Sequence, residues 1–395
     1  MKVLVHTLQL GVILILNIFS GGFLQMRYFS TLIKPASSLC NMRCRYCFYY
    51  DVVSNREVAS YGVMDRGTAV KLIERAFEYT PAPGQLTFAF QGGEPTLAGL
   101  DYYRFFVEEV RRRQQDGHTV AYAIQTNGQV LDEEWCRFLK ENQFLVGLSL
   151  DGPREIHDFQ RLDSSLKGTF DTTHRALNLL KRHKIEYNVL TVLTKQTAKK
   201  PQTLYRFFEK EKIDYVQVIP CLKALEAQDQ PDKPFDLTPK LYSSFLKDFF
   251  ALWYEGLRKD RYISVRQFDN LVWMMKGRPA EQCGMMGFCS PQFVVEADGG
   301  VYPCDFYVLD EYYSGNIMTS SFEEIRKAAG TERFIKYEEP QNSLCPSCPV
   351  RGLCGGGCKR YRSFYNAEPG YCPYQDFLCE AYDRLREIAE NVTLE

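Results

Sequence analysis

The sequence predicts an α/β fold, with a parallel sheet that is open or curled into a partial barrel, followed by a smaller cysteine-rich unit. Three observations support this prediction. Short apolar or β-rich runs alternate with longer stretches of helical period between residues 29 and 219. The chain has 395 residues, which exceeds one average domain. The C-terminal third holds most of its 14 cysteines.

The predicted strands and helices follow one another in a regular order. Runs rich in β-branched, aromatic or aliphatic residues predict strands at 29–33, 86–90, 121–124, 145–150, 188–193 and 215–219. Apolar residues at a helical period predict intervening helices that include 65–79, 102–114, 133–141, 170–183 and 202–211. Such a series implies a parallel sheet, because each crossover helix returns the chain to the same edge.

Polar and glycine-rich segments follow the predicted strands, at the ends where such sheets usually carry their chemistry. These segments contain Cys40, QGGEP at 91–95, QTNG at 125–128, Ser149 with DGP after it, and Pro220, Cys221 and Leu222. Asn, Asp, Gly and Pro also serve ordinary turns, which is the alternative for QTNG or DGP taken singly. Their place at successive strand ends favours one shared site.

The most informative motif is the CxxxCxxC loop of Cys40, Cys44 and Cys47, directly after the first strand. Three neighbouring thiolates can hold three irons of a [4Fe-4S] cluster and leave the fourth iron without a protein ligand. The amine and carboxylate of S-adenosylmethionine can chelate that open iron. Structural zinc would require a fourth ligand, and no His or further Cys lies within the next forty residues.

These residues resemble the signature of the radical S-adenosylmethionine superfamily, which includes an aromatic residue matched by Tyr46. The resemblance implies a TIM-like partial (β/α)6 barrel. It also implies that Gly93 contacts the methionine amine, that Ser149 and Arg161 hold the ribose and the carboxylate, and that Leu222 lies near the adenine. Taken singly, Arg161 is equally explained as a solvated surface charge.

The C-terminal cysteines have a second distinctive pattern. Cys283 and Cys289 are followed by Gly299 and Cys304, then by a Cx2Cx5Cx3C run from Cys345 to Cys358, and finally by Cys372 and Cys379. This layout resembles the SPASM extension of radical enzymes that modify peptides. The resemblance implies two closed auxiliary [4Fe-4S] clusters, one on Cys283, Cys289, Cys304 and Cys358 and one on Cys345, Cys348, Cys354 and Cys379. Cys372 is the alternative last ligand, and a pair of zinc ribbons is the alternative interpretation of the whole pattern.

The resemblance narrows to the anaerobic sulfatase-maturating enzymes through LIKPASSLCNMRCRYCFYYD, TFAFQGGEPTLAGL, FLVGLSLDGP and FVVEADGGVYPCDFYVLD. It implies oxidation of a Cys or Ser in a C/S-x-P-x-R motif of a sulfatase to Cα-formylglycine, with S-adenosylmethionine and three [4Fe-4S] clusters as cofactors. A reductant such as flavodoxin or ferredoxin is the implied electron donor. Asp305 matches the family's proton acceptor, although a turn cap is its alternative role. Tyr49 and Gln91 are candidate hydrogen-bonding partners of the substrate.

Two rival functions stay open at this point. Another SPASM enzyme could form thioether crosslinks in a ribosomal peptide, but only 39 residues precede Cys40, which leaves little room for a leader-binding module. A zinc-binding adaptor without catalytic activity is the rival from another class. The formal net charge of −1 provides no field that would attract nucleic acid or an anionic membrane, so neither is an expected partner.

The apolar N-terminus resembles a signal peptide, but it is short for a membrane span. We favour a start codon placed too early, with Met26 as the functional start. We therefore expect a leader or mis-assigned start at 1–25, the partial barrel at 26–255, a linker region at 256–282 and the auxiliary-cluster domain at 283–395. Oxygen-sensitive clusters predict a cytoplasmic enzyme.

Overall fold

The computed structural model describes residues 27–221, 223–225 and 233–392. Within them, one mixed sheet has the strand order β7-β6-β5-β4-β3-β2-β1-β8-β9. Its strands are β1 (Arg27–Ile33), β2 (Gly84–Phe90), β3 (His118–Thr126), β4 (Phe144–Ser149), β5 (Tyr187–Leu193), β6 (Tyr215–Pro220), β7 (Ser264–Val265), β8 (Val294–Val295) and β9 (Val301–Tyr302). The α/β class predicted from the sequence is confirmed.

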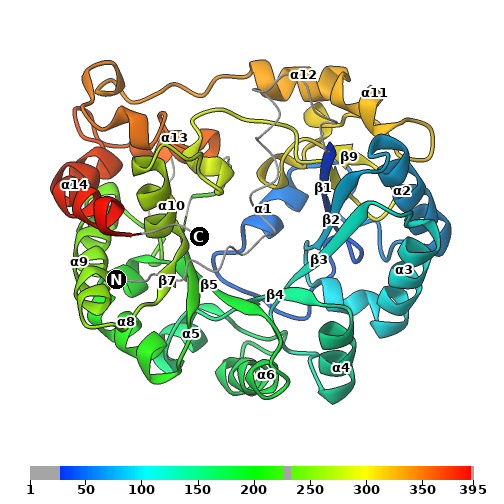
Figure 1. Cartoon of the computed structure of the whole chain (residues 1–395), viewed down its shortest axis with the longest axis horizontal. Coiled ribbons are helices and arrows are strands. Elements are labelled where there is room, and N and C mark those ends of the chain that lie inside the picture. Colours follow the sequence, from blue (N-terminus) through cyan, green and yellow to red (C-terminus); the bar gives the residue numbers. More distant parts are fainter. Residues whose placement is uncertain (1–26, 222, 226–232, 393–395) are drawn as a thin grey trace.

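Strands β1 to β6 are parallel and lie side by side in chain order, as the six predicted runs require. In the β1–β2 pair, Arg27 is opposite Gly84 and Ile33 is opposite Phe90. The sheet curves into an open arc, with α2, α3, α4, α6 and α8 along its outer side (Figure 1). The carboxyl ends of all six strands therefore open onto one end of the arc.

The helices of the first half alternate with the strands. They are α1 (Phe48–Ser54), α2 (Arg66–Tyr79), α3 (Leu100–Arg113), α4 (Glu133–Glu141), α5 (Arg154–Gln160), α6 (Phe170–Arg182), α7 (Lys195–Ala198) and α8 (Pro201–Lys210). Helix α2 illustrates why they form here. The Asp65 side chain accepts a hydrogen bond from the Thr68 amide at 2.9 Å, and Ala69, Leu72, Ile73 and Ala76 form one buried stripe.

The second half adds α9 (Pro239–Arg258), α10 (Arg266–Met275), α11 (Phe322–Arg326), α12 (Ala329–Lys336), α13 (Lys359–Tyr365) and α14 (Pro373–Asn391). The segments drawn from yellow to red lie across the open side of the arc in Figure 1. Strand β8 pairs in parallel with β1, and β9 pairs antiparallel with β8. The C-terminal part of the chain thus extends the same sheet at its β1 edge.

Both halves also share one hydrophobic core. A single cluster of buried residues includes Phe29 and Leu86 of the barrel together with Val295, Phe377 and Leu385 of the C-terminal part. Nothing in the structure tests the predicted boundaries at 255 and 282, which stay predictions. The predicted leader 1–25 and Leu222 lie outside the described residues. Among the described helices, none combines the length and the apolar character needed to cross a bilayer.

Candidate active site

A cavity of about 460 Å³ lies at the carboxyl ends of the strands. The loops after β1, β2 and β3, Ser149 at the end of β4, and residues of β5 and β6 line its barrel side. Cys283, Cys289, Cys304 and Cys358 line its other side. The three-cysteine loop and the first predicted auxiliary set therefore face one cavity.

The loop that carries Cys40, Cys44 and Cys47 is held by the segment that follows α5. The Arg43 amide donates to the Leu162 carbonyl at 2.7 Å, and the Arg45 amide donates to the Gln160 carbonyl at 3.0 Å. These backbone contacts bring Arg161 beside the cysteines. Burial raises the pKa of Cys40 to about 11 and that of Cys44 to about 12, with Arg161 opposing the rise. Burial therefore favours the protonated thiols in the protein without a metal centre.

Arg161, Tyr46 and Asp151 form a compact polar group behind this loop. Arg161 is buried, so it is not a solvated surface charge, and its Nη1 donates to the Tyr46 hydroxyl at 2.8 Å. That hydroxyl donates to Asp151 Oδ2 at 2.5 Å. The Arg161 Nε is buried and has no hydrogen-bond partner among the described residues. A guanidinium with a free donor beside the cysteines suits an incoming carboxylate.

Gly93 approaches the backbone of the cysteine loop. Its amide donates to the Ser37 carbonyl at 2.9 Å, and a Cβ at this position would lie 2.2 Å from the Leu39 carbonyl oxygen. A side chain at this position would clash with the loop backbone, so the residue must be glycine. The contact between Gly93 and the methionine amine stays a prediction. Both Gly92 and Gly93 line the cavity.

Glu94 connects the QGGEP and QTNG segments. Its Oε1 accepts from the Thr126 hydroxyl at 2.7 Å, and its Oε2 accepts from the Asn127 amide at 2.8 Å. The side chain is buried, and burial raises its pKa despite these hydrogen bonds. The alternative of ordinary turns does not account for a buried carboxylate that holds two strand ends together at the cavity.

Asp305 stands between the two halves of the cavity. It begins the short 3-10 helix η5 (Asp305–Tyr307), directly after Cys304. Its Oδ1 accepts from Lys34 Nζ at 2.5 Å, and its Oδ2 accepts from Gln91 Nε2 at 2.6 Å. No side-chain capping hydrogen bond is formed at this helix start, so the capping alternative is not supported. Both oxygens are instead committed to residues at the ends of β1 and β2.

Tyr49 lies next to this group. Its ring lies 3.7 Å from Lys34 Nζ, and its hydroxyl donates to Glu296 Oε1 at 2.5 Å. Arg56 Nη1 donates to the same oxygen at 2.7 Å. Burial and Glu296 raise the pKa of the Tyr49 hydroxyl, so it remains a donor toward Glu296. Tyr49 lines the cavity, but its hydroxyl already has a partner within the protein.

The first auxiliary set is brought together as the sequence predicted. Burial raises the pKa of Cys358 to about 12, and the nearby Cys283 and Cys289 thiols contribute to the rise. Burial and Cys358 likewise raise the pKa of Cys304. Four thiols from distant parts of the chain thus influence one another across a single site. A closed four-cysteine set is what an auxiliary [4Fe-4S] cluster requires.

The second auxiliary set lies away from the cavity. Burial raises the pKa of Cys354 to about 11, with contributions from Cys348, Cys372 and Cys345. Burial and Cys348 also raise the pKa of Cys379. Cys372 and Cys379 therefore both approach this set, and the assignment of Cys379 as the last ligand stays a prediction.

All fourteen cysteines are free thiols. Among the described residues, no three Cys, His, Asp or Glu side chains converge closely enough to hold a single metal ion.

Sequence reasoning singled out the cysteines, Asp305, Arg161 and Gln91. It included Glu94 and Asp151 only as parts of the QGGEP and DGP segments, and it missed Lys34, Glu296 and Arg56. Lys34 offered one available signal, because a lone lysine at the end of an otherwise buried strand is rarely left without a partner. The others become informative only when the fold places them behind the cavity.

Comparisons with known proteins agree with this geometry. Residues 35–208 match the Radical SAM superfamily model, and residues 283–349 match the SPASM model, described as an iron-sulfur cluster-binding domain. A cysteine-type anaerobic sulfatase-maturating enzyme of Clostridium novyi is 44% identical over 92% of this chain and 95% of its own. A Clostridium perfringens enzyme of the same description is 40% identical over 92% and 99%. The solved structure of anSMEcpe with bound AdoMet superposes with a TM-score of 0.85 at 39% identity, covering 93% of this chain and 100% of that one.

The three-cysteine loop at the strand ends and the auxiliary cysteines define the class, a radical S-adenosylmethionine protein with a SPASM domain. Within that class, the chain belongs to the family of anaerobic sulfatase-maturating enzymes.

Proposed function

We propose that this chain oxidises a Cys or Ser in a C/S-x-P-x-R motif of a sulfatase to Cα-formylglycine. The observation that carries the proposal is the single cavity lined by the three-cysteine loop, Asp305 and the first auxiliary cysteines. In the proposal, a radical source, a proton acceptor and an electron acceptor surround one substrate atom in this cavity. Relatives that are 44% and 40% identical to this chain are named cysteine-type anaerobic sulfatase-maturating enzymes.

The chain's own residues would hold the cofactor on the barrel side. In the proposal, Cys40, Cys44 and Cys47 ligate the first cluster, the Arg161 guanidinium pairs with the methionine carboxylate, and Gly93 and Ser149 contact the amine and the ribose. Tyr46 holds Arg161, and Leu222 remains the proposed adenine contact. A bound and reduced cluster would supply, through S-adenosylmethionine, a 5'-deoxyadenosyl radical able to take a hydrogen atom from the substrate Cβ.

Asp305 is the proposed base for the next step. Its carboxylate accepts the proton of the substrate thiol while one electron leaves the substrate and a C=S bond forms. Hydrolysis of that thioaldehyde releases hydrogen sulfide and leaves the aldehyde. For a Ser substrate, the hydroxyl proton takes the same path and the aldehyde forms directly. Gln91 and Tyr49 are proposed to border the substrate.

Two auxiliary clusters would carry the electron away. The proposed ligands are Cys283, Cys289, Cys304 and Cys358 for the cluster nearer the cavity, and Cys345, Cys348, Cys354 and Cys379 for the other. A small electron-transfer protein such as flavodoxin or ferredoxin is the proposed reductant of the first cluster.

A cysteine in the motif is the preferred target in our proposal. The Clostridium relatives at 44% and 40% identity are named cysteine-type enzymes, whereas a serine-type enzyme of Bacteroides thetaiotaomicron is 29% identical. We also propose a cytoplasmic enzyme with domains at 26–255 and 283–395 joined by 256–282.

The experiment is anaerobic incubation of the reconstituted protein with S-adenosylmethionine, dithionite and paired peptides that contain either Cys or Ser in the motif. Mass spectrometry should show loss of the thiol and gain of an aldehyde in the Cys peptide. Formation of 5'-deoxyadenosine without any change in either peptide would contradict the proposal and favour a different peptide substrate, including the crosslinking alternative.

A further inference from the structure

Lys34 is a buried cation with no role in the reaction as described so far. It directly follows Ile33, the last residue of β1, and its exposed fraction is 0%. Burial of an ammonium group costs several kcal/mol unless nearby charges and hydrogen bonds compensate. A lysine retained at such a position must therefore interact with something specific.

The first partner of Lys34 is Asp305. Lys34 Nζ donates to Oδ1 at 2.5 Å, and Gln91 Nε2 donates to Oδ2 at 2.6 Å. The two donors come from residues that follow β1 and β2, which are paired in register. A carboxylate with both oxygens bound to two rigid strand ends has one fixed orientation in the cavity.

A second buried pair keeps Lys34 in place. The Tyr49 ring contacts Lys34 Nζ at 3.7 Å, and Glu296 binds both Tyr49 and Arg56. Burial opposes ionisation of Glu296, but Lys34 and Arg56 outweigh it and lower the Glu296 pKa. Two cations thus balance two carboxylates within the protein interior. The array restricts the lysine to the direction of Asp305.

We propose that Lys34 is a positioning residue for proton removal: with Gln91 it aims Asp305 at the substrate, and the array of Tyr49, Glu296 and Arg56 fixes Lys34. The proposal rests on the function proposed above. In the step concerned, the substrate S–H bond breaks and its proton moves to a carboxylate oxygen of Asp305. The substrate radical loses one electron toward the auxiliary clusters, and a C=S bond forms. Lys34 itself exchanges no proton.

The principal variant is Lys34→Met, which has a similar length and no charge. Each carboxylate keeps one partner, Asp305 with Gln91 and Glu296 with Arg56, so folding is expected. We expect the ratio of 5'-deoxyadenosine to formylglycine to rise about tenfold or more, since misplacement of a reacting group by an ångström has effects of this size. The peptide kcat should fall while its KM stays within about twofold.

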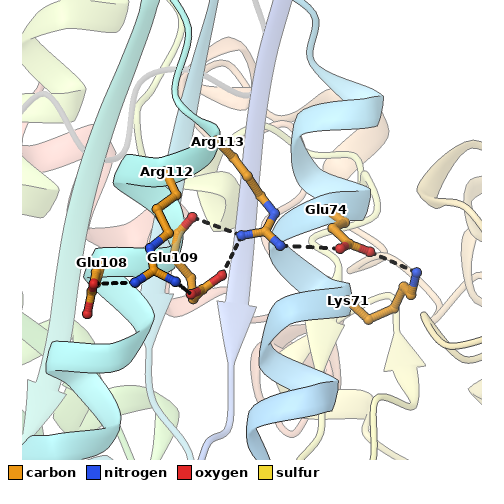
Figure 2. A network of polar contacts seen from close by, with 6 residues as sticks. All are labelled: Lys71, Glu74, Glu108, Glu109, Arg112 and Arg113. Atoms are coloured by element: carbon orange, nitrogen blue, oxygen red, sulfur yellow. Dashed lines mark hydrogen bonds and ion pairs between the residues drawn. The ribbon is translucent and has the colours of Figure 1, made fainter.

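The surface provides a matched control. Lys71 pairs with Glu74 in a network that joins α2 and α3 through Arg113 and Glu109 (Figure 2). Exposed pairs of this kind contribute little to stability. Lys71→Met should therefore leave the ratio and kcat unchanged. Iron content and melting temperature are measured for both variants, so that loss of fold or of clusters is seen separately from misdirected chemistry.

A double variant separates positioning from charge balance. Lys34→Met with Glu296→Gln removes one charge of each sign, so the interior stays neutral while Asp305 still loses its lysine. Our proposal expects the raised ratio to persist, and Lys34→Arg to restore part of the coupling. A normal ratio in Lys34→Met or in the double variant, with clusters intact, would overturn the proposal. Absence of formylglycine from the unmodified enzyme would instead refute the proposed function.

Discussion

Asp305 is the residue on which the proposed chemistry depends most directly. Its oxygens are bound by Lys34 and Gln91, and Cys304 precedes it in the chain. In Asp305→Asn the shape is kept, but the proton acceptor is lost. We expect clusters and S-adenosylmethionine cleavage to persist while formylglycine formation falls by about a hundredfold or more, the usual size of a general-base contribution.

Paired assays of 5'-deoxyadenosine and peptide aldehyde measure this effect. Asp310→Asn is a suitable control, because Asp310 is also near η5 but binds the Glu57 amide at the surface. If Asp305→Asn made aldehyde at the normal rate, the base would have to be another group.

Single residues also show how far sequence reasoning reaches. Cys40, Cys44 and Cys47 could be assigned a cluster because ligand spacing within one loop is local information. Asp305 required the family resemblance, and Lys34 and Glu296 were not found. Each of these buried charges is explained only by a partner more than 200 residues away, which no local pattern can indicate.

At the scale of elements, the contact between the loops after β1 and β2 determines whether the cysteine loop can form. In Gly93→Ala, the new Cβ would meet the Leu39 carbonyl oxygen at 2.2 Å. Backbone at that distance must move, so we expect loss of the first cluster, a decrease of about four irons of roughly twelve. Iron analysis of anaerobically purified protein measures it.

Gly352→Ala is the matched control for this loop prediction. Gly352 lies in η8 (Arg351–Leu353), between the proposed ligands Cys348 and Cys354. No atom lies within 4 Å of a Cβ added there. Its iron content should be normal. Full iron in Gly93→Ala would show that the loop can shift without losing its cluster.

The junction of β7 and α10 carries a buried carboxylate, Asp269, that forms no ion pair within the described part of the chain. Asp269 accepts from the Tyr262 hydroxyl at 2.7 Å and from the Ser264 hydroxyl at 2.5 Å, and burial raises its pKa to about 7. Between about pH 4 and pH 7, the folded protein therefore binds a proton that the unfolded chain releases. Stability should fall as the pH rises through this window.

Asp269→Asn removes that contribution. Between about pH 5.5 and pH 7.5 the apparent melting temperature of both proteins should decrease. The decrease in Asp269→Asn should be smaller than that in the unmodified protein by roughly 2 °C or more. Other titrating groups affect both proteins equally, so the difference isolates Asp269. Parallel melting curves across this range would contradict the expectation.

The predicted elements were right where the pattern had enough length. All six barrel strands span six residues or more, and each was recognised from its apolar run. Strands β7, β8 and β9 have two residues each and were missed, because two residues cannot display a period. Their pairing is determined by the fold around them.

At the scale of the whole molecule, the three cysteine sets should be separable. Replacing Cys40, Cys44 and Cys47 together with Ala should leave about eight irons in the two auxiliary clusters and abolish S-adenosylmethionine cleavage. Cys136→Ala is the control. Cys136 is fully buried on α4, so its loss should lower stability by about 1 kcal/mol and leave all irons in place. Loss of all iron from the triple variant would show that the sets assemble only together.

The sequence predicted two successive units but could not predict that they share a core. The single hydrophobic cluster and the continuous sheet across β1 and β8 depend on contacts between distant segments. The spacing of the cysteines indicated a three-cysteine loop and a C-terminal group, and the assignment of ligands to each cluster stays a prediction. The three-cysteine loop and the first auxiliary set line one cavity because the fold places Cys304 and Asp305 beside the end of β1.

The pairing of β1 with β8 has a consequence for biosynthesis. The Thr31 hydroxyl donates to the Phe293 carbonyl across a separation of 262 residues, so the β1 edge has no partner until most of the chain has been translated. At ribosomal speeds this interval is on the order of 10–50 s. A nascent chain with an open strand edge is prone to aggregation. We therefore expect yields of this protein to depend on chaperone supply.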